Sequence, residues 1–165
     1  MLDANKALLT RHFNEVLNHG DLDVIDQIYG EHYVLDAPIQ TDGSLEAHGE
    51  TLGRDGLRRR VVAFRSAFPD IAFTIDTMLA DGDQVAVQYT FTGTHDGTFG
   101  DLEATGRSIS VAGVLIAVVD DGRIQRAFSV FDSGDMLHQL VPEQRGPIHR
   151  LIDELAGRLH LSRAI

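Results

Sequence analysis

The side chains whose type and setting suit them to chemistry are Asp36, Gln88, His95 and Asp132. Asp132 ends an apolar, strand-like run, 127–132, and a helix-like stretch, 135–140, follows it. Period-two alternation would place Asp132 on one strand face with Phe128 and Val130. Apolar surroundings disfavour the charged form of a carboxylate and suit it to proton transfer. Asp132 is therefore the first candidate for a general acid/base.

Each of the two acids also has a purely structural interpretation. Asp132 can cap a helix that begins near Ser133, and this role is compatible with a place in a pocket. Asp36 precedes Ala37 and Pro38, where an Asp often hydrogen-bonds to the backbone. If both acids entered one cavity, their repulsion would keep one of them protonated and give an acid beside a base.

Gln88 and His95 are candidates for supporting roles. Gln88 can orient a carbonyl oxygen through a hydrogen bond. His95 follows Gly93 and Thr94 at a predicted strand end, where it can relay a proton or simply hold the turn.

Composition excludes several classes of function. The sequence of 165 residues has 14 Lys and Arg against 25 Asp and Glu, a formal net charge of −11 that repels nucleic acid over most of the surface. The cations cluster only at 58–60, where a helix would present them to solvent. Cysteine is absent, which removes thiolate chemistry, and the histidines lack metal-site spacing. We expect no metal, no cofactor, no membrane span and a cytoplasmic protein.

The first half of the chain carries helical patterns. Apolar residues recur at helical spacing over 9–17, Asp21 can cap a second short helix over 22–29, and a third pattern runs over 57–68 until Pro69 ends it. A polar, turn-rich stretch, 36–53, separates the second helix from the third.

The second half alternates with a period of two. Val85, Val87, Tyr89 and Phe91 alternate with smaller or polar residues, and Asp81-Gly82-Asp83 makes a turn before them. Two further strands, about 108–119 and 123–132, are joined by Asp120-Asp121-Gly122, a typical hairpin turn. The Gly-rich stretch 93–107 is either a flap over a cavity or a solvent-exposed excursion. Helices followed by an antiparallel meander predict an α+β domain.

Several short segments, in this order and spacing, resemble the SnoaL-like polyketide cyclases, or ester cyclases, of the NTF2-like superfamily. They are Asn5 to Leu8, Asn18 to Leu22, Tyr33 to Pro38, Gly53 to Leu57, Phe68 to Asp70, Gly93 to His95, Thr105 to Arg107, Asp121 to Ile124, Phe128, Asp132 and Gln139-Leu140. The resemblance implies a cone in which a curved antiparallel sheet wraps around N-terminal helices and encloses a pocket.

The resemblance also implies roles for single residues. An Asp at the position of Asp132 is the expected acid/base catalyst of an intramolecular aldol ring closure, with Asp36 and His95 as possible helpers. The expected substrate-binding residues are Tyr33, Phe68, Gln88, Phe128 and Val130. The chain departs from the family pattern at Asp36, where a His is common, at Gln88, where an Arg is common, and at Phe128, where a Trp is usual.

We therefore expect one domain, 1–165, that binds a small apolar or aromatic ligand. A helix over about 147–161 carries an apolar stripe that must cover this domain or a second subunit, and a homodimer is expected through that helix or a sheet face. The preferred function is a cyclase or isomerase that uses Asp132. The alternatives are a hydrolase like the epoxide hydrolases of this fold, with paired acids and water, and a non-catalytic binding protein.

Overall fold

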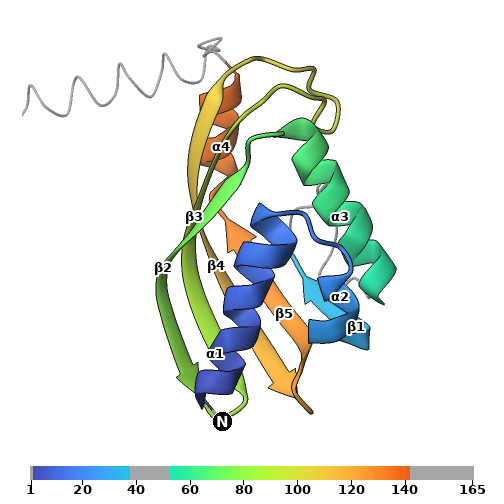
Figure 1. Cartoon of the computed structure of the whole chain (residues 1–165). Coiled ribbons are helices and arrows are strands. Elements are labelled where there is room, and N and C mark those ends of the chain that lie inside the picture. The colour runs from blue at the N-terminus through green and yellow to red at the C-terminus, as the bar shows by residue number, and fades with distance from the viewer. Residues whose placement is uncertain (1, 38–52, 142–165) are drawn as a thin grey trace, which may run out of the picture.

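The computed structural model describes residues 2–37 and 53–141. Helices precede most of the sheet, as predicted (Figure 1). The elements, in chain order, are α1 (Leu2–Arg11), the π-helix η1 (His12–Asn18), α2 (Val24–Ile28), β1 (Tyr29–Asp36), α3 (Gly53–Ala67), β2 (Ala72–Asp81), β3 (Gln84–Thr94), β4 (Ser108–Asp120), β5 (Arg123–Phe131) and α4 (Ser133–Leu140).

The three predicted N-terminal helical regions are present. Leu9, Phe13 and Val16 point to the core from α1 and η1, and each is at most 1% exposed. The second helix is shorter than predicted because Tyr29 already belongs to β1. Asp21 accepts a hydrogen bond from the amide of Asp23 in the turn before α2, which is the local role that its position indicates.

The five strands form one sheet in the order β1-β5-β4-β3-β2. The neighbours from β2 to β5 pair antiparallel, as the predicted meander requires. The strand β1, which the sequence pattern did not reveal, pairs parallel with β5 and opposes Asp36 to Phe128. Its addition extends the predicted sheet by one parallel strand at the edge.

Both predicted tight turns are confirmed. Gly82, between β2 and β3, has φ of 56°. Asp121 and Gly122, between β4 and β5, have φ of 48° and 66°. Positive φ at both central residues is the requirement of the tight hairpin turns that match strand twist, and Asp-Gly meets it.

Within residues 2–37 and 53–141, helices cover one face of the sheet, and most strand residues on the other face are exposed. Helices α1, α2 and α3 lie over the inner face, with α1 crossing in front of the strands in Figure 1. Along β3 and β4 the residues strictly alternate between buried and exposed or half-buried positions, which is the period-two pattern of a one-sided sheet. The predicted α+β layout is thus confirmed, and a single buried core lies between helices and inner face.

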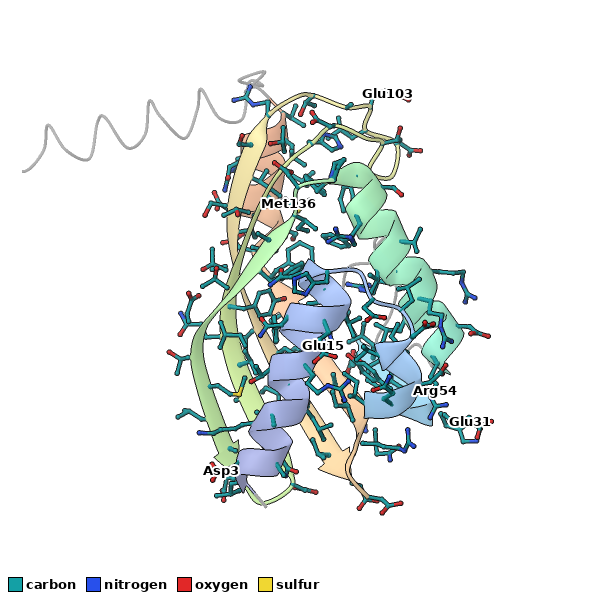
Figure 2. The ribbon with its side chains drawn as sticks, viewed as in Figure 1. Asp3, Glu15, Glu31, Arg54, Glu103 and Met136 are labelled. Carbon is teal, nitrogen blue, oxygen red and sulfur yellow. The ribbon has the colours of Figure 1, made fainter. Side chains whose placement is uncertain are left out.

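The connection 95–107 is anchored at the end of α3. The amides of Asp96 and Gly97 donate to the carbonyl of Ala67 at 3.1 and 3.0 Å. His95 and Phe99 are buried, whereas exposed residues, among them Glu103 at the far end, lie between and after them (Figure 2). The segment is therefore partly a packed element, which neither sequence-based interpretation anticipated.

Helix α4 continues the line of β5 along the edge of β4. Gln139 fixes its end, because its side chain accepts from the amide of Ser110 at 2.7 Å and donates to its carbonyl at 3.0 Å. The helix predicted over about 147–161 lies outside the described residues. Among the residues that the structure describes, no helix is long and apolar enough to cross a membrane.

Candidate active site

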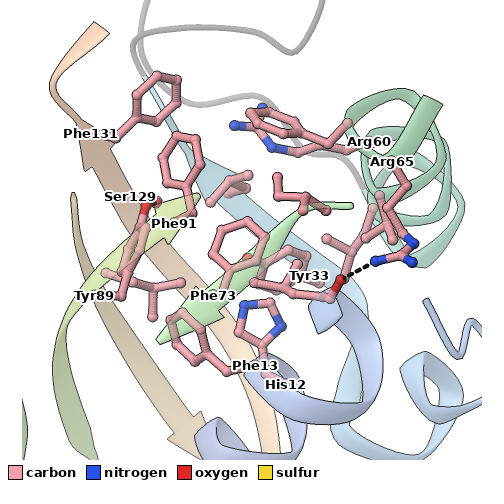
Figure 3. A pocket seen from close by; sticks show the side chains of 17 residues that line it. His12, Phe13, Tyr33, Arg60, Arg65, Phe73, Tyr89, Phe91, Ser129 and Phe131 are labelled. Carbon is pink, nitrogen blue, oxygen red and sulfur yellow. Dashed lines mark hydrogen bonds between the residues drawn. The ribbon is translucent and has the colours of Figure 1, made fainter. Parts of the chain in front are cut away.

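A cavity opens between the helices and the inner face of the sheet (Figure 3). The space between its walls is about 720 Å³, a figure that includes its opening to solvent. The lining residues are His12, Phe13, Leu17, Tyr33, Leu35, Leu57, Arg60, Val61, Phe64, Arg65, Ile71, Phe73, Tyr89, Phe91, Leu115, Ser129 and Phe131.

Aromatic rings make up much of the wall. The ring of Phe91 lies 5.4 Å from Phe73 and 5.5 Å from Phe131, between centroids. Phe64 of α3 meets Phe91 edge-on at 6.1 Å, and Phe13 lies 5.3 Å from Tyr89. Such packing fixes the wall and offers both faces and edges of rings to a flat ligand.

His12 brings a neutral imidazole to the cavity. Burial lowers the pKa of His12 to about 4, so the ring is uncharged at neutral pH. Its Nδ1 lies 2.6 Å from the hydroxyl of Tyr29. Burial holds the pKa of Tyr29 well above its ordinary value, so this hydroxyl keeps its proton. The hydroxyl and the neutral imidazole share one buried hydrogen bond, whose direction follows the tautomer of the ring.

Arg60 and two tyrosines add further donors. Burial raises the pKa of Tyr33, and the positive charge of Arg60 partly offsets that effect. Burial also raises the pKa of Tyr89, against the hydrogen bond from Ser129 and the charge of Arg60. Arg60, Tyr33 and Tyr89 all line the cavity, which therefore contains a cation and two protonated phenols.

The position of Tyr89 depends on a glycine in the neighbouring strand. Its hydroxyl lies 3.2 Å from the Ser129 hydroxyl, and Gly113 opposes it in β4. A Cβ at position 113 would lie 2.5 Å from the Tyr89 ring. The ring can lie flat along the cavity wall because residue 113 has no side chain.

Two further arginines, one of them in the cavity lining, make described contacts. Arg65 donates to the carbonyls of Leu17 and Asn18 at 3.0 and 2.8 Å and so ties α3 to η1. Arg58 pairs with Asp26 and Asp55. The prediction that residues 58–60 form one solvated face is wrong for Arg60, since only Arg59 is fully on the exposed side.

Of the predicted site residues, only Tyr33 lines the cavity. Phe68 is completely buried just behind it, with its ring 6.2 Å from that of Phe64. Phe68 therefore supports the cavity wall from behind Phe64, and it does not line the cavity as predicted.

Asp132 does not line the cavity, contrary to the sequence-based expectation. Its side chain is exposed, and Oδ1 accepts from the amide of Asp135 at 2.9 Å. This is the helix-capping geometry. The carboxylate thus takes the structural role that the sequence also allowed, at the start of α4 and directly after Phe131, whose ring does line the cavity.

Phe128, Val130 and Gln88 lie on the opposite face of the sheet. Phe128 and Val130 are 39% and 38% exposed, and Gln88 is exposed as well. The inner positions of these strands are taken by Ser129, Phe131 and Tyr89. The assignment of Phe128 and Val130 to the pocket was wrong by one residue of strand parity.

Asp36 and His95 also lie away from the cavity lining. Asp36 is half-buried at the end of β1 beside Phe128. His95 is fully buried, and its Nδ1 accepts from the Thr105 amide at 3.3 Å and lies 3.1 Å from its hydroxyl. Burial lowers the pKa of His95. The structure supports the turn-holding interpretation of His95 and does not bring the three predicted catalytic residues together.

The sequence did contain signals for the polar residues that were missed. Arg60 continues the helical stripe of Leu57, Val61 and Phe64 at spacings of three and four, so it had to face inward with them. Tyr89 belongs to the alternating apolar set of β3 that the sequence analysis recognised. His12 precedes Phe13 on the inner side of η1, but no pattern distinguished it from the other histidines.

The polar groups on the described part of the lining are two arginines, three hydroxyl groups and the imidazole of His12. Among the residues that the structure describes, no carboxylate lines the cavity and no group of three potential metal ligands occurs. A lining with arginines and hydroxyl groups stabilises negative charge on an oxygen atom of a ligand. The cavity is suited to an enolate, a phenolate or a strongly polarised carbonyl group.

Comparison with known proteins identifies the family of the chain. The family model of the SnoaL-like polyketide cyclases matches residues 7–140. The chain belongs to the SnoaL-like polyketide cyclase family. No curated protein matches the chain at a significant level.

Solved structures of SnoaL-like proteins share the fold. A SnoaL-like protein from Jannaschia sp. CCS1 is 18% identical, with a TM-score of 0.75 over 86% of this chain and 94% of that one. The candidate polyketide cyclase IdmH of Streptomyces antibioticus is 27% identical, with a TM-score of 0.72 over 82% and 97%. The candidate hydroxylase AclR of Streptomyces galilaeus is 21% identical, with a TM-score of 0.73 over 100% and 99%. The NTF2-like cone is therefore the fold of this chain.

Proposed function

We propose that this chain binds an aromatic, polyketide-like carbonyl compound in the cavity and promotes its enolisation and aldol-type ring closure. The observation that carries the proposal is Arg60, a cation in a wall of aromatic rings and beside two tyrosines. A cation there stabilises an enolate oxygen more than it stabilises the parent ketone, and such differential binding lowers the barrier.

The reaction needs one proton to leave carbon and one to reach oxygen. A methylene between two carbonyls loses a proton, the enolate carbon attacks a second carbonyl carbon, and the resulting alkoxide takes a proton back. The guanidinium of Arg60 and the hydroxyl of Tyr33 are donors for the developing oxygen charge. No metal or Schiff base is required when the methylene is already acidic.

Asp132 is the proton acceptor in this proposal. The family pattern supports it, together with its position directly after Phe131 of the cavity wall. The cap uses Oδ1 only, and a carboxylate has a second oxygen that can accept a proton. Because Asp132 lies outside the described lining, this role has a test of its own.

The test uses 1-phenylbutane-1,3-dione, a simple aromatic diketone, as the probe. Affinity is measured by ultraviolet titration, and enolisation by deuterium exchange of its methylene in NMR spectra. Loss of a hydrogen bond to a charged group costs about 1.5–3 kcal/mol, so Arg60→Met should weaken enolate binding by roughly 10- to 100-fold. Arg59→Met removes the same charge from the exposed side of α3 and should change affinity by less than about twofold. Equal effects would contradict the proposal.

Asp132→Asn separates the two roles of Asp132. Asparagine caps a helix about as well as aspartate but is no base. The variant should keep its stability and lose exchange of the probe. If exchange persists at the wild-type rate, Asp132 is only a cap.

The second candidate function is binding of the same class of compound without turnover. The capping geometry of Asp132 favours it, because that carboxylate has a complete structural role. In this case wild-type protein binds the diketone, Arg60→Met weakens binding, and the protein does not accelerate methylene exchange. A hydrolase with paired acids has less support, since the described lining contains no carboxylate.

A further inference from the structure

Two hydroxyl groups meet on the sheet side of the cavity. Tyr89 of β3 and Ser129 of β5 both line the cavity, and their hydroxyl oxygens are 3.2 Å apart (Figure 3). The two strands are not neighbours, because β4 lies between them. The side chain of Tyr89 therefore reaches across β4 to make this contact. We call the hydroxyl groups of Tyr89 and Ser129 the hydroxyl pair.

Residue 113 is the point at which the tyrosine ring crosses β4. Gly113 opposes Tyr89 in β3 and Phe131 in β5. A Cβ at this position would lie 2.5 Å from the ring of Tyr89 and 2.6 Å from its hydroxyl oxygen. Gly113 is not one of the glycines with positive φ, so space and not backbone conformation requires a glycine here. The glycine thus permits the position of the Tyr89 hydroxyl.

The hydroxyl pair has hydrogen-bonding capacity left for a ligand. Each hydroxyl has one proton, and one of the two protons is enough for the hydrogen bond between them. Among the residues that the structure describes, neither hydroxyl has a further hydrogen-bond partner. Tyr89 is only 5% exposed, and burial raises its pKa, so its hydroxyl keeps its proton at neutral pH. The second proton of the pair can therefore be donated to an oxygen atom in the cavity.

Arg60 and the hydroxyl pair lie on different walls of the cavity. Arg60 comes from α3, which covers the inner face of the sheet, and the pair comes from two strands of the sheet itself. Figure 3 shows Arg60 on the helix side of the cavity and the pair on the sheet side. A ligand whose enolate oxygen lies at Arg60 satisfies both walls only if it carries a further oxygen.

We propose that the hydroxyl pair is a second polar subsite, which hydrogen-bonds an oxygen atom on the aromatic end of the ligand. This inference rests on the proposed function. It narrows the substrate class to aromatic carbonyl compounds with a further oxygen on the ring, as a phenol hydroxyl or a ring carbonyl. An unsubstituted ring would leave a donor of the pair without a partner in the cavity, which lowers affinity.

Three probes test the subsite: 1-phenylbutane-1,3-dione and its analogues with a hydroxyl group at the meta or the para position of the ring. Ultraviolet titration gives the Kd of each probe. We define the preference as the Kd of the parent probe divided by the Kd of the tighter analogue. A hydrogen bond between neutral groups should give wild-type protein a preference of roughly 3- to 10-fold. The ring hydroxyl also changes the acidity of the diketone, so the preference is compared between proteins.

The double variant Tyr89→Phe with Ser129→Ala removes the two oxygen atoms of the pair and nothing else. Its preference should disappear. Both substitutions are needed, because either hydroxyl alone keeps a proton to donate. Thr92→Val with Ser110→Ala is the matched control. Thr92 and Ser110 oppose each other on β3 and β4 and are exposed, so the control should keep the wild-type preference.

Gly113→Ala tests the crossing without removal of a hydroxyl. A Cβ at position 113 would meet the Tyr89 ring and its hydroxyl oxygen, so the hydroxyl must move and the preference should fall in this variant too. A wild-type preference in Gly113→Ala would overturn the role of the crossing in forming the subsite.

The outcomes separate this inference from the proposed function. If Arg60→Met weakens binding of the parent probe but the analogues bind wild-type protein no more tightly than the parent, the subsite is wrong and the proposed function stands. If none of the three probes binds, both are wrong. A preference that persists in the double variant would overturn the assignment of the subsite to Tyr89 and Ser129.

Discussion

The two faces of the sheet are equally rich in apolar side chains near β4 and β5, yet they differ in what surrounds them. The inner face carries Tyr89, Ser129 and Phe131 into a cavity with a cation, and the outer face carries Val114, Ile116 and Phe128 without a described cover. Hydrophobicity alone does not mark the functional side of a strand. The functional side is marked by the polar groups that the helices bring to the inner face.

The largest expected difference between the faces is in stability. Phe91 is 1% exposed on the inner face, whereas its neighbour Thr92 is exposed on the outer face. Phe91→Ala should lower the free energy of unfolding by about 3–5 kcal/mol, and Thr92→Ala by less than about 1 kcal/mol. Urea unfolding measures both. Similar losses would mean that the outer face at β3 is also covered.

The inner face should also make stability depend on pH through His12. Its folded pKa is about 4 against an ordinary 6.5. The unfolded chain binds the proton first, so stability is complete above pH 6.5 and falls as the pH drops toward 4, by up to about 3 kcal/mol. The lowered pKa of His95 acts in the same direction.

A pair of variants isolates the contribution of His12. The double variant His12→Phe with Tyr29→Phe removes both partners of the buried hydrogen bond and should flatten the dependence between pH 4 and 6.5. Tyr29→Phe alone keeps the imidazole and should retain most of the slope. Chemical unfolding at a series of pH values gives the comparison, and an unchanged slope in the double variant would assign the dependence to other groups.

Sequence patterns predicted β3 well and β5 poorly, for a physical reason. In β3, Val85, Val87 and Tyr89 alternate with Gln84 and Gln88, so only one face can be buried. In β5, the outer residues Phe128 and Val130 are more apolar than their inner neighbour Ser129. The register with β4 also shifts between Val118 and Val119, so that Ile124 and Ala127, three residues apart, are both buried. Apolar character therefore indicated the wrong face, and the pocket residues were assigned one position off.

The strand β1 and the polar site escaped prediction because both depend on distant contacts. β1 is an edge strand whose partner β5 lies about ninety residues later in the chain, and Gly30, Glu31 and His32 break its apolar pattern. His12 and Arg60 meet Tyr89 only after helices from two parts of the chain pack on the sheet. The helices, the hairpins and the fold class follow from local patterns, and the site does not.

Gly113 offers a smaller test of the inner face. A methyl group there would lie 2.5 Å from the Tyr89 ring, and Gly113→Ala should cost about 1–3 kcal/mol through displacement of that ring. Ala112→Thr, on the exposed side of the same strand, should change stability by no more than about 0.5 kcal/mol. Thermal unfolding compares the two. In a Tyr89→Leu background the cost of Gly113→Ala should shrink, and a cost that stays the same would place the strain in the backbone.

The smallest effect on stability is expected at Asp132, which lies between the end of β5 and the start of α4. Its Oδ1 caps the helix through the Asp135 amide, so Asp132→Ala should lower the free energy of unfolding by about 1 kcal/mol and Asp132→Asn by much less. If the carboxylate of Asp132 serves only as a cap, its loss lowers the free energy of unfolding. If the carboxylate serves only catalysis, its loss should leave stability unchanged or raise it, because catalytic groups often cost stability. Urea unfolding of the three proteins at pH 7 decides between these. An alanine variant at least as stable as the wild type would show that the cap contributes nothing, and the carboxylate would then be retained for the cavity side.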